Sequence, residues 1–125
     1  MFSIDVALIH VMRKFCLACD LKNEDRLIDA YDTYHREVWP EIQDSLKQSG
    51  IIAMEIYRTG NRLFMIIGVT DEFSFEKKAA MDLANPIVQK WESFMSEFQQ
   101  QIAWAPPDVK WVLMERVFNF EAGEK

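Results

Sequence analysis

Three side chains between residues 31 and 39 have the types and the spacing of a small acid–base site. Tyr31, His35 and Trp39 recur every four residues, and residues four apart project from one face of a helix. Histidine transfers protons near neutral pH, while aromatic rings stack on the apolar face of a ligand and a phenol bonds its polar groups. The column therefore indicates proton transfer on a polyhydroxylated ligand. An aromatic core stripe with an incidental histidine gives the same pattern, and on spacing alone that structural alternative is the commoner one.

Three other candidate site residues can also be explained by an ordinary structural role. Trp91 lies on the apolar stripe of a later helix, where it contributes either to the core or to a ligand site. Glu92 is adjacent to it and off that stripe, so alone it reads as a solvated charge. Met54 is one of several strand methionines, which more often fill cores than bind metals.

The two cysteines do not indicate a metal or redox centre. Cys16 and Cys19 are three residues apart in a predicted strand, so their side chains should point to opposite faces and remain free thiols. A zinc site needs about four ligands, and the chain has only two further candidates of the usual nitrogen type, His10 and His35. We expect neither a metal nor a cofactor.

Hydrophobic periodicity predicts the elements that must position these residues. Alternating patterns predict strands, and spacings of three and four predict amphipathic helices. Pro40 lacks an amide hydrogen and should kink or break the first helix. The predicted strands are 12–21, 51–58, 62–70 and 109–118, and the predicted helices are 24–49, 74–83 and 85–102.

The order β-α-β-β-α-β is typical of a ferredoxin-like α+β sandwich. Helices on one side would leave the other sheet face bare, and we expect Met54, Phe64 and Trp111 to make that face partly apolar. By analogy with the fold, a second copy packed there would give a dimeric α/β barrel. The predicted organisation is one domain over residues 12–120, with an extension over residues 1–11 and a tail over residues 121–125.

Composition and charge exclude several classes of function. The chain has 125 residues, a net charge of −6 and no cluster of more than two adjacent basic residues, which argues against nucleic acids and anionic membranes as partners. We find no hydrophobic run long enough to cross a membrane and no secretory signal. Together with free thiols, these features predict a cytoplasmic protein.

Several motifs resemble those of the L-rhamnose mutarotase family. Tyr31-Asp-Thr-Tyr-His35-Arg-Glu-Val-Trp39-Pro40-Glu41 is similar to the family signature Tyr-x-x-x-His-x-x-x-Trp-Pro-Glu. The resemblance continues, in order and at family spacing, through the segments 56–58, 61–64, 85–91 and 111–115. It begins at Met12, and residues 1–11 have no counterpart in the family.

The resemblance implies a function and a set of site residues. It implies that His35 is the proton donor, that Tyr31 binds the sugar, and that Trp91 and Trp39 stack on it. Two positions depart from the family pattern: Met54 stands where the family has a sugar-binding tyrosine, and Glu92 replaces the second residue of a tryptophan pair. The pair Trp91-Glu92 and the predicted strand segment 110–115 resemble the branch proposed for L-fucose, so L-rhamnose and L-fucose both remain open.

The implied reaction is the interconversion of α and β anomers of a 6-deoxyhexose by acid–base ring opening, without a cofactor. A homodimer is the implied assembly and a monosaccharide the implied ligand. His35 and Tyr31 would be the catalytic residues: His35 would protonate the ring oxygen, and Tyr31 would orient the sugar or share the proton. Glu92 would bind hydroxyls or act as the partner base. Two alternatives remain: a cofactor-independent monooxygenase on the same dimeric barrel, and a sugar-binding module without catalysis.

Overall fold

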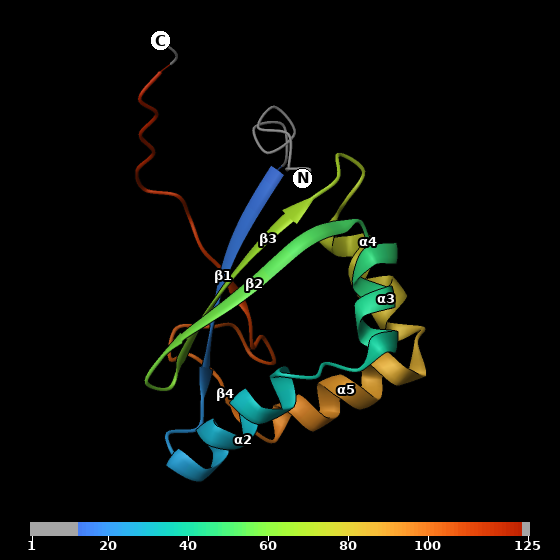
Figure 1. Cartoon of the computed structure of the whole chain (residues 1–125), viewed down its shortest axis with the longest axis vertical. Coiled ribbons are helices and arrows are strands. Elements are labelled where there is room, and N and C mark those ends of the chain that lie inside the picture. Colours follow the sequence, from blue (N-terminus) through green and yellow to red (C-terminus); the bar gives the residue numbers. More distant parts are fainter. Residues whose placement is uncertain (1–12, 124–125) are drawn as a thin grey trace.

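The computed structural model describes residues 13–123 and has a single sheet with helices packed against it (Figure 1). The predicted extension at residues 1–11 lies outside the described residues. In chain order the elements are β1 (Arg13–Leu21), α2 (Asp25–His35), α3 (Pro40–Gln48), β2 (Ile51–Thr59), β3 (Arg62–Val69), α4 (Phe75–Leu83), α5 (Pro86–Ser96), β4 (Gln99–Gln100) and β5 (Val112–Leu113). This order confirms the predicted ferredoxin-like α+β fold.

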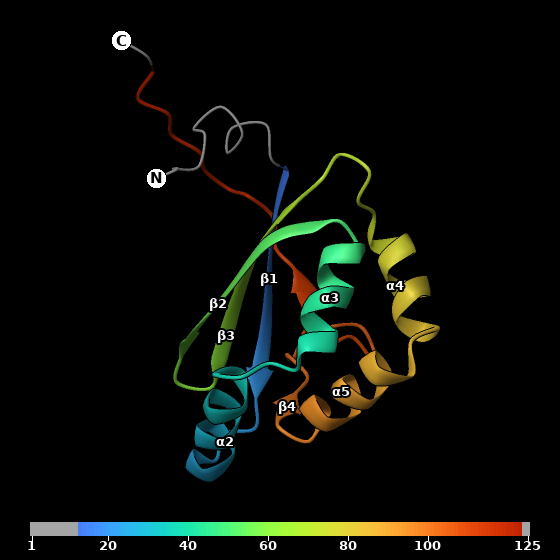
Figure 2. The same ribbon diagram turned by 45° about the vertical axis from the view of Figure 1, so that its right-hand side comes forward.

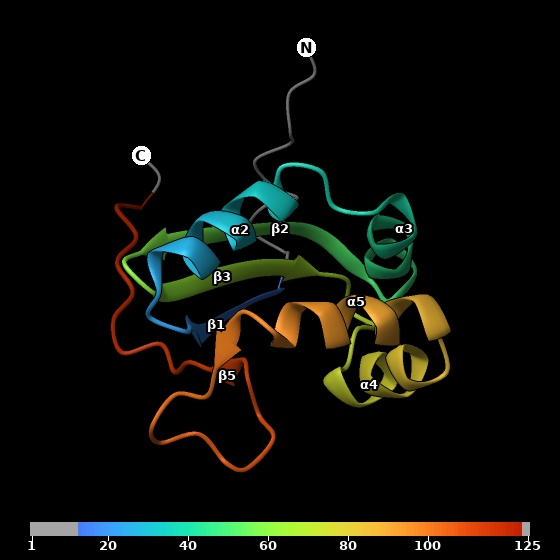
Figure 3. The ribbon, with the colours of Figure 1, turned by 90° about the horizontal axis from the view of Figure 1, so that it is seen from below.

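The sheet is antiparallel and open. Its strands follow the order β2-β3-β1-β4, and β5 also pairs with β1; the three long strands lie side by side in Figure 3. A two-residue turn at Gly60 and Asn61 joins β2 to β3, because Thr59 already pairs with Arg62. The turn is tied to the end of β1, since the Leu21 amide donates to the Asn61 carbonyl at 2.7 Å.

All four helices lie on one face of this sheet (Figure 2). Side chains alternate between the two faces of a strand, and the helix-facing set of β1 and β3 is buried: Leu17, Cys19, Leu21, Leu63, Ile67 and Val69. Cys16 has the opposite parity, so the two thiols point to opposite faces as predicted, and both are free.

The prediction for the uncovered face was wrong for two residues. Met54 pairs with the buried Ile67, and both Met54 and Trp111 pack against buried residues of the core on the helix side. Phe64 lies on the uncovered face, because it pairs with Ala18, whose neighbours Leu17 and Cys19 point into the core. Strand parity therefore turns Met54 toward the helices.

Pro40 divides the first helical region as predicted. The chain leaves helical structure after His35 and starts a new helix at Pro40, which occupies its first turn, where a missing amide costs nothing. Asn85 caps the start of α5, at the residue where the sequence predicts this helix to begin, since its side chain accepts hydrogen bonds from the Ile87 and Val88 amides.

Two predicted lengths near the C-terminus were wrong. The helix predicted to reach residue 102 ends at Ser96, where short-range bonds from the Glu97 and Phe98 amides close its last turn and β4 joins the sheet edge. The strand predicted over 109–118 is only Val112–Leu113. Beyond the Met114 amide, which donates to the Cys16 carbonyl at 2.8 Å, the chain extends away from the sheet (Figures 1 and 2).

Candidate active site

A large open cavity of about 1330 Å³ lies between the helices and the sheet face that they cover. Elements distant in sequence contribute to its wall because α2, α3, α4 and α5 all lie over one sheet face. The lining residues on which the site depends are Leu17, Tyr31, His35, Met54, Ile56, Met65, Ile67, Lys78, Asp82, Trp91, Glu92, Lys110 and Trp111. Both predicted catalytic residues and four of the five predicted substrate-binding residues therefore line the same cavity, and Trp39 is the exception.

Tyr31 and His35 form a stacked pair at the end of α2. Their rings are 4.0 Å apart at an interplanar angle of 27°. Nδ1 of His35 lies 3.0 Å from the carbonyl oxygen of Tyr31. A carbonyl only accepts, so Nδ1 carries a hydrogen, and Nε2 is the nitrogen that exchanges a proton. One turn of helix thus fixes both the ring and its tautomer.

Burial shifts the pKa values of both members of this pair. It lowers the pKa of His35 below its ordinary value of 6.5, while the hydrogen bond to Tyr31 and the charge of Asp32 oppose that shift. Burial also raises the pKa of the Tyr31 phenol, with smaller contributions from Cys19 and Asp32. At neutral pH, His35 is therefore mainly a neutral base at Nε2 and Tyr31 remains a neutral hydroxyl.

Trp91 contacts His35 edge to face, with ring centroids 5.6 Å apart. Trp39 does not share the face of Tyr31 and His35 as predicted, because the helix ends at His35 and Trp39 caps the start of α3. Its ring packs instead against Trp91, at 4.9 Å and 70°. Trp39 thus supports the aromatic wall from behind rather than lining the cavity.

The sheet supplies an apolar floor. Met54 on β2 faces Ile67 on β3, and Met65 and Leu17 continue this surface across β3 and β1. A thioether at Met54 offers only a weak hydrogen-bond acceptor to a ligand. The floor therefore contributes shape and apolar contact.

A polar cluster on α4 and α5 forms another part of the wall. Lys78 Nζ lies 2.6 Å from Asp82 Oδ2, and Asp82 is 8% exposed. Its second oxygen, Oδ1, is buried and forms no hydrogen bond among residues 13–123. Partial burial and the nearby Asp82 raise the pKa of Glu92, while Lys78 and Gln89 oppose the shift. This cluster holds several groups able to bind hydroxyls.

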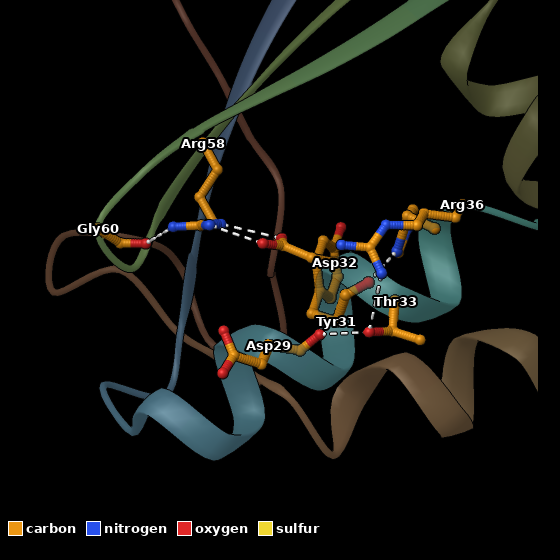
Figure 4. Close-up of polar contacts among 8 residues, drawn as sticks. Asp29, Tyr31, Asp32, Thr33, Arg36, Arg58 and Gly60 are labelled. Carbon is orange, nitrogen blue, oxygen red and sulfur yellow. Dashed lines mark hydrogen bonds and ion pairs between the residues drawn. The ribbon is translucent and has the colours of Figure 1, made fainter.

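Lys78 and Asp82 were missed by the sequence interpretation. Their spacing of four residues on a predicted helix could have identified the pair, but not its proximity to Glu92. Asp32 and Arg58 were also missed. They form an ion pair (Figure 4), and both line a small cavity together with His35.

Within residues 13–123, no group of three or more His, Cys, Asp and Glu side chains is placed to hold a metal ion. None of the helices in that range is long and apolar enough to span a membrane.

This geometry defines an α+β protein of ferredoxin-like fold with an aromatic cavity built around a half-buried histidine. The sequence profile of the L-rhamnose mutarotase family matches residues 14–120, and the chain belongs to this family.

Two relatives show the extent of the similarity. An L-fucose mutarotase of Xanthomonas campestris is 39% identical over 109 residues, which cover 86% of this chain and 87% of the relative. The crystal structure of an L-rhamnose mutarotase from Formosa agariphila has a TM-score of 0.64 at 26% identity, covering 87% of this chain and 99% of that one. A dimeric ferredoxin-like protein from an uncultured marine organism, with a TM-score of 0.51 at 12% identity over 88% of this chain and 93% of its own, shares the fold.

Proposed function

We propose that the protein is a mutarotase that interconverts the α and β anomers of a 6-deoxyhexose. The observation that carries this proposal is the orientation of His35, whose Nδ1 is bonded to the Tyr31 carbonyl so that Nε2 is left for proton transfer beside an aromatic wall. Membership of the L-rhamnose mutarotase family supports a carbohydrate substrate. The similarity to an L-fucose mutarotase supports L-fucose as the first sugar to test.

His35 provides both proton transfers of ring opening. Its Nε2 accepts the proton of the anomeric hydroxyl, the oxygen electron pair forms the C1 carbonyl, and the bond from C1 to the ring oxygen breaks. The ring oxygen then takes the proton from Nε2. Both oxygens are bonded to C1, so a single nitrogen can serve both. Rotation of the aldehyde group and the reverse steps give the other anomer, with no net change in protons or electrons.

The remaining residues bind and orient the sugar. Tyr31 donates its hydroxyl, which burial keeps protonated. Trp91 stacks on the apolar ring face, and Trp39 holds Trp91 in place. Met54 contacts the methyl group that distinguishes a 6-deoxyhexose, and Glu92 accepts sugar hydroxyls beside Lys78 and Asp82.

The polar cluster favours this function over its alternatives. A monooxygenase acting on an aromatic substrate would gain little from Lys78, Asp82 and Glu92 in its cavity wall, because burying them against an apolar ligand is costly. A non-catalytic sugar-binding module has no need for a histidine with a free Nε2. Binding of L-fucose without anomer exchange would favour that second candidate.

Saturation-exchange NMR between the anomers of L-fucose and L-rhamnose tests the proposal. The wild-type protein should accelerate exchange of at least one of the two sugars. His35→Gln should lower the catalysed rate by roughly 10²-fold or more, because a positioned acid or base contributes about 10²–10⁴-fold. His10→Gln, which removes the other histidine of the chain, is the matched control and should keep the wild-type rate. Equal rates for wild type and His35→Gln would contradict the role of His35.

The proposal includes the assembly and the compartment. The uncovered sheet face places Phe64 and Ile66 beside Ala18 and Cys16, which is an apolar surface suited to a second copy, and a dimeric ferredoxin-like protein shares the fold. We therefore propose a homodimer. The free thiols of Cys16 and Cys19 suit a reducing compartment, and the cytoplasm is the compartment we propose.

A further inference from the structure

Asp32 and Arg58 form a two-point ion pair between α2 and β2. Arg58 Nε lies 2.9 Å from Asp32 Oδ1, and Nη2 lies 2.6 Å from Oδ2. The third donor, Nη1, bonds the Gly60 carbonyl at 2.8 Å, so the guanidinium is held by the hairpin as well as by the helix (Figure 4). Both side chains are about one-third exposed. Geometry of this kind orients a carboxylate more strictly than a single contact does.

Asp32 and Arg58 share a second, smaller cavity with His35, the proposed reacting residue. This cavity, of about 320 Å³, is lined by Tyr31, His35, Asp32, Arg58, Arg36, Ile56 and Leu63. Tyr31 and His35 line both cavities. Their side chains therefore lie between the main cavity and the smaller one, which the carboxylate and the guanidinium also line.

Arg58 determines how the Asp32 carboxylate can act on His35. Both Asp32 oxygens are engaged by the guanidinium, and Nδ1 of His35 is engaged by the Tyr31 carbonyl. The carboxylate thus acts on the imidazole through its charge and not through a direct bond.

We propose that Asp32 and Arg58 are positioning residues for His35, which act on it across the small cavity by balancing the charge beside its ring. This role rests on the proposed mutarotase function. The negative charge of Asp32 favours the protonated form of His35, and the positive charge of Arg58 weakens that effect.

Other polar and aromatic groups around His35 also affect its protonation, so a test must leave them unchanged. They are Tyr31 on α2 and Arg36 directly after it, and on α5 the neighbour in contact is the uncharged Trp91. Glu92 lies in the wall of the main cavity. None of these groups is altered in the variants below.

The test measures the pKa of His35 by NMR in a His10→Gln background, where His35 is the only remaining imidazole. Asp32→Asn should lower this pKa, because it removes the negative charge that opposes desolvation. Arg58→Gln should raise it, because the Asp32 charge is then less compensated. Arg58→Lys keeps the charge and should return the pKa toward the wild-type value. Asp25→Asn and Arg26→Gln make the same charge changes in the first turn of α2 and should leave the pKa unchanged.

Shifts in the same direction for Asp32→Asn and Arg58→Gln, or shifts no larger than those of the two controls, would overturn the inference. A merely structural ion pair predicts this result, since both variants would loosen the same contact. If Asp32→Asn does not fold, Arg58→Gln alone must still raise the pKa, and a fall or no change contradicts the proposal. The titration needs no enzymatic activity, so absence of anomer exchange in the wild type would refute the proposed function and leave this test intact.

Discussion

Nδ1 of His35 lies 3.0 Å from the carbonyl oxygen of Tyr31, one helical turn earlier in α2. The contact joins a side chain to the backbone of the residue whose ring it stacks upon. Two constraints on one imidazole fix the plane of the ring and the nitrogen that reacts. The last turn of α2 therefore contains both the reacting group and the means of orienting it.

The pH dependence of exchange follows from the lowered pKa of His35. Burial favours the neutral imidazole, and the proposed mechanism starts from neutral Nε2. The catalysed rate should rise as pH increases through the folded-state pKa, below 6.5, and then stay level near pH 7. The measurement is exchange NMR from pH 5 to pH 8, with the rate in buffer alone subtracted at each pH. A rate that falls over this range would mean that the protonated form starts the reaction.

Sugar preference should respond to a hydroxyl introduced at Met54. Met54→Tyr restores the residue type that the family pattern has at this position. It should shift the ratio of kcat/KM for L-fucose to that for L-rhamnose toward L-rhamnose by about 3- to 10-fold, because one hydrogen bond contributes roughly 0.5–1.5 kcal/mol. Met54→Leu, which has no hydroxyl, is the control and should leave the ratio near that of the wild type. An equal shift in both variants would assign the effect to side-chain shape.

Local signals predicted much of the fold and part of the site. Pro40 and Asn85 act through their own backbone positions, so the helix starts could be read directly from the sequence. The proximity of Tyr31 and His35 is likewise a local property of one helical turn.

Relationships between distant segments could not be predicted in the same way. Arg58 reaches Asp32 across 26 residues of sequence, and only the packing of α2 over β2 brings them together. Met54 and Trp111 were assigned to the wrong sheet face, because a one-residue change of parity reverses every side chain of a strand and a register shift separates Ile51 from Ala53. The length of β5 depends on its pairing partner and not on its own composition.

Association through the uncovered sheet face can be tested at Phe64. The C-terminal segment that leaves the sheet exposes further apolar side chains, since Val117, Phe118 and Phe120 are 94%, 79% and 74% exposed. Phe64→Glu should convert the proposed dimer to a monomer, because the carboxylate would be desolvated in the interface. Light scattering after size exclusion measures the mass. Leu83→Glu, an equivalent change at the end of α4 on an exposed residue, should remain dimeric. A monomeric wild type would contradict the assembly.

Gly50 should be the more sensitive of two glycines that adopt positive φ. It joins α3 to β2 with φ of 98°, and an added Cβ would lie 2.9 Å from Thr70 Oγ1 and 3.5 Å from Phe73 Cβ. The Gly50 carbonyl also accepts from the Thr70 amide at 2.9 Å, so the backbone cannot move freely to relieve the contact. Gly50→Ala should lower the free energy of unfolding by about 2–3 kcal/mol, combining backbone strain with this close approach.

Gly60, in the hairpin turn, supplies the matched comparison. Its φ is 57° and an added Cβ would meet no atom within 4 Å, so Gly60→Ala should cost only the backbone strain, about 1 kcal/mol. Urea unfolding at one fixed protein concentration measures both variants, because any association adds to the apparent stability. Equal losses for the two variants would show that the Thr70 contact relaxes, and that positive φ alone determines the cost at the start of β2.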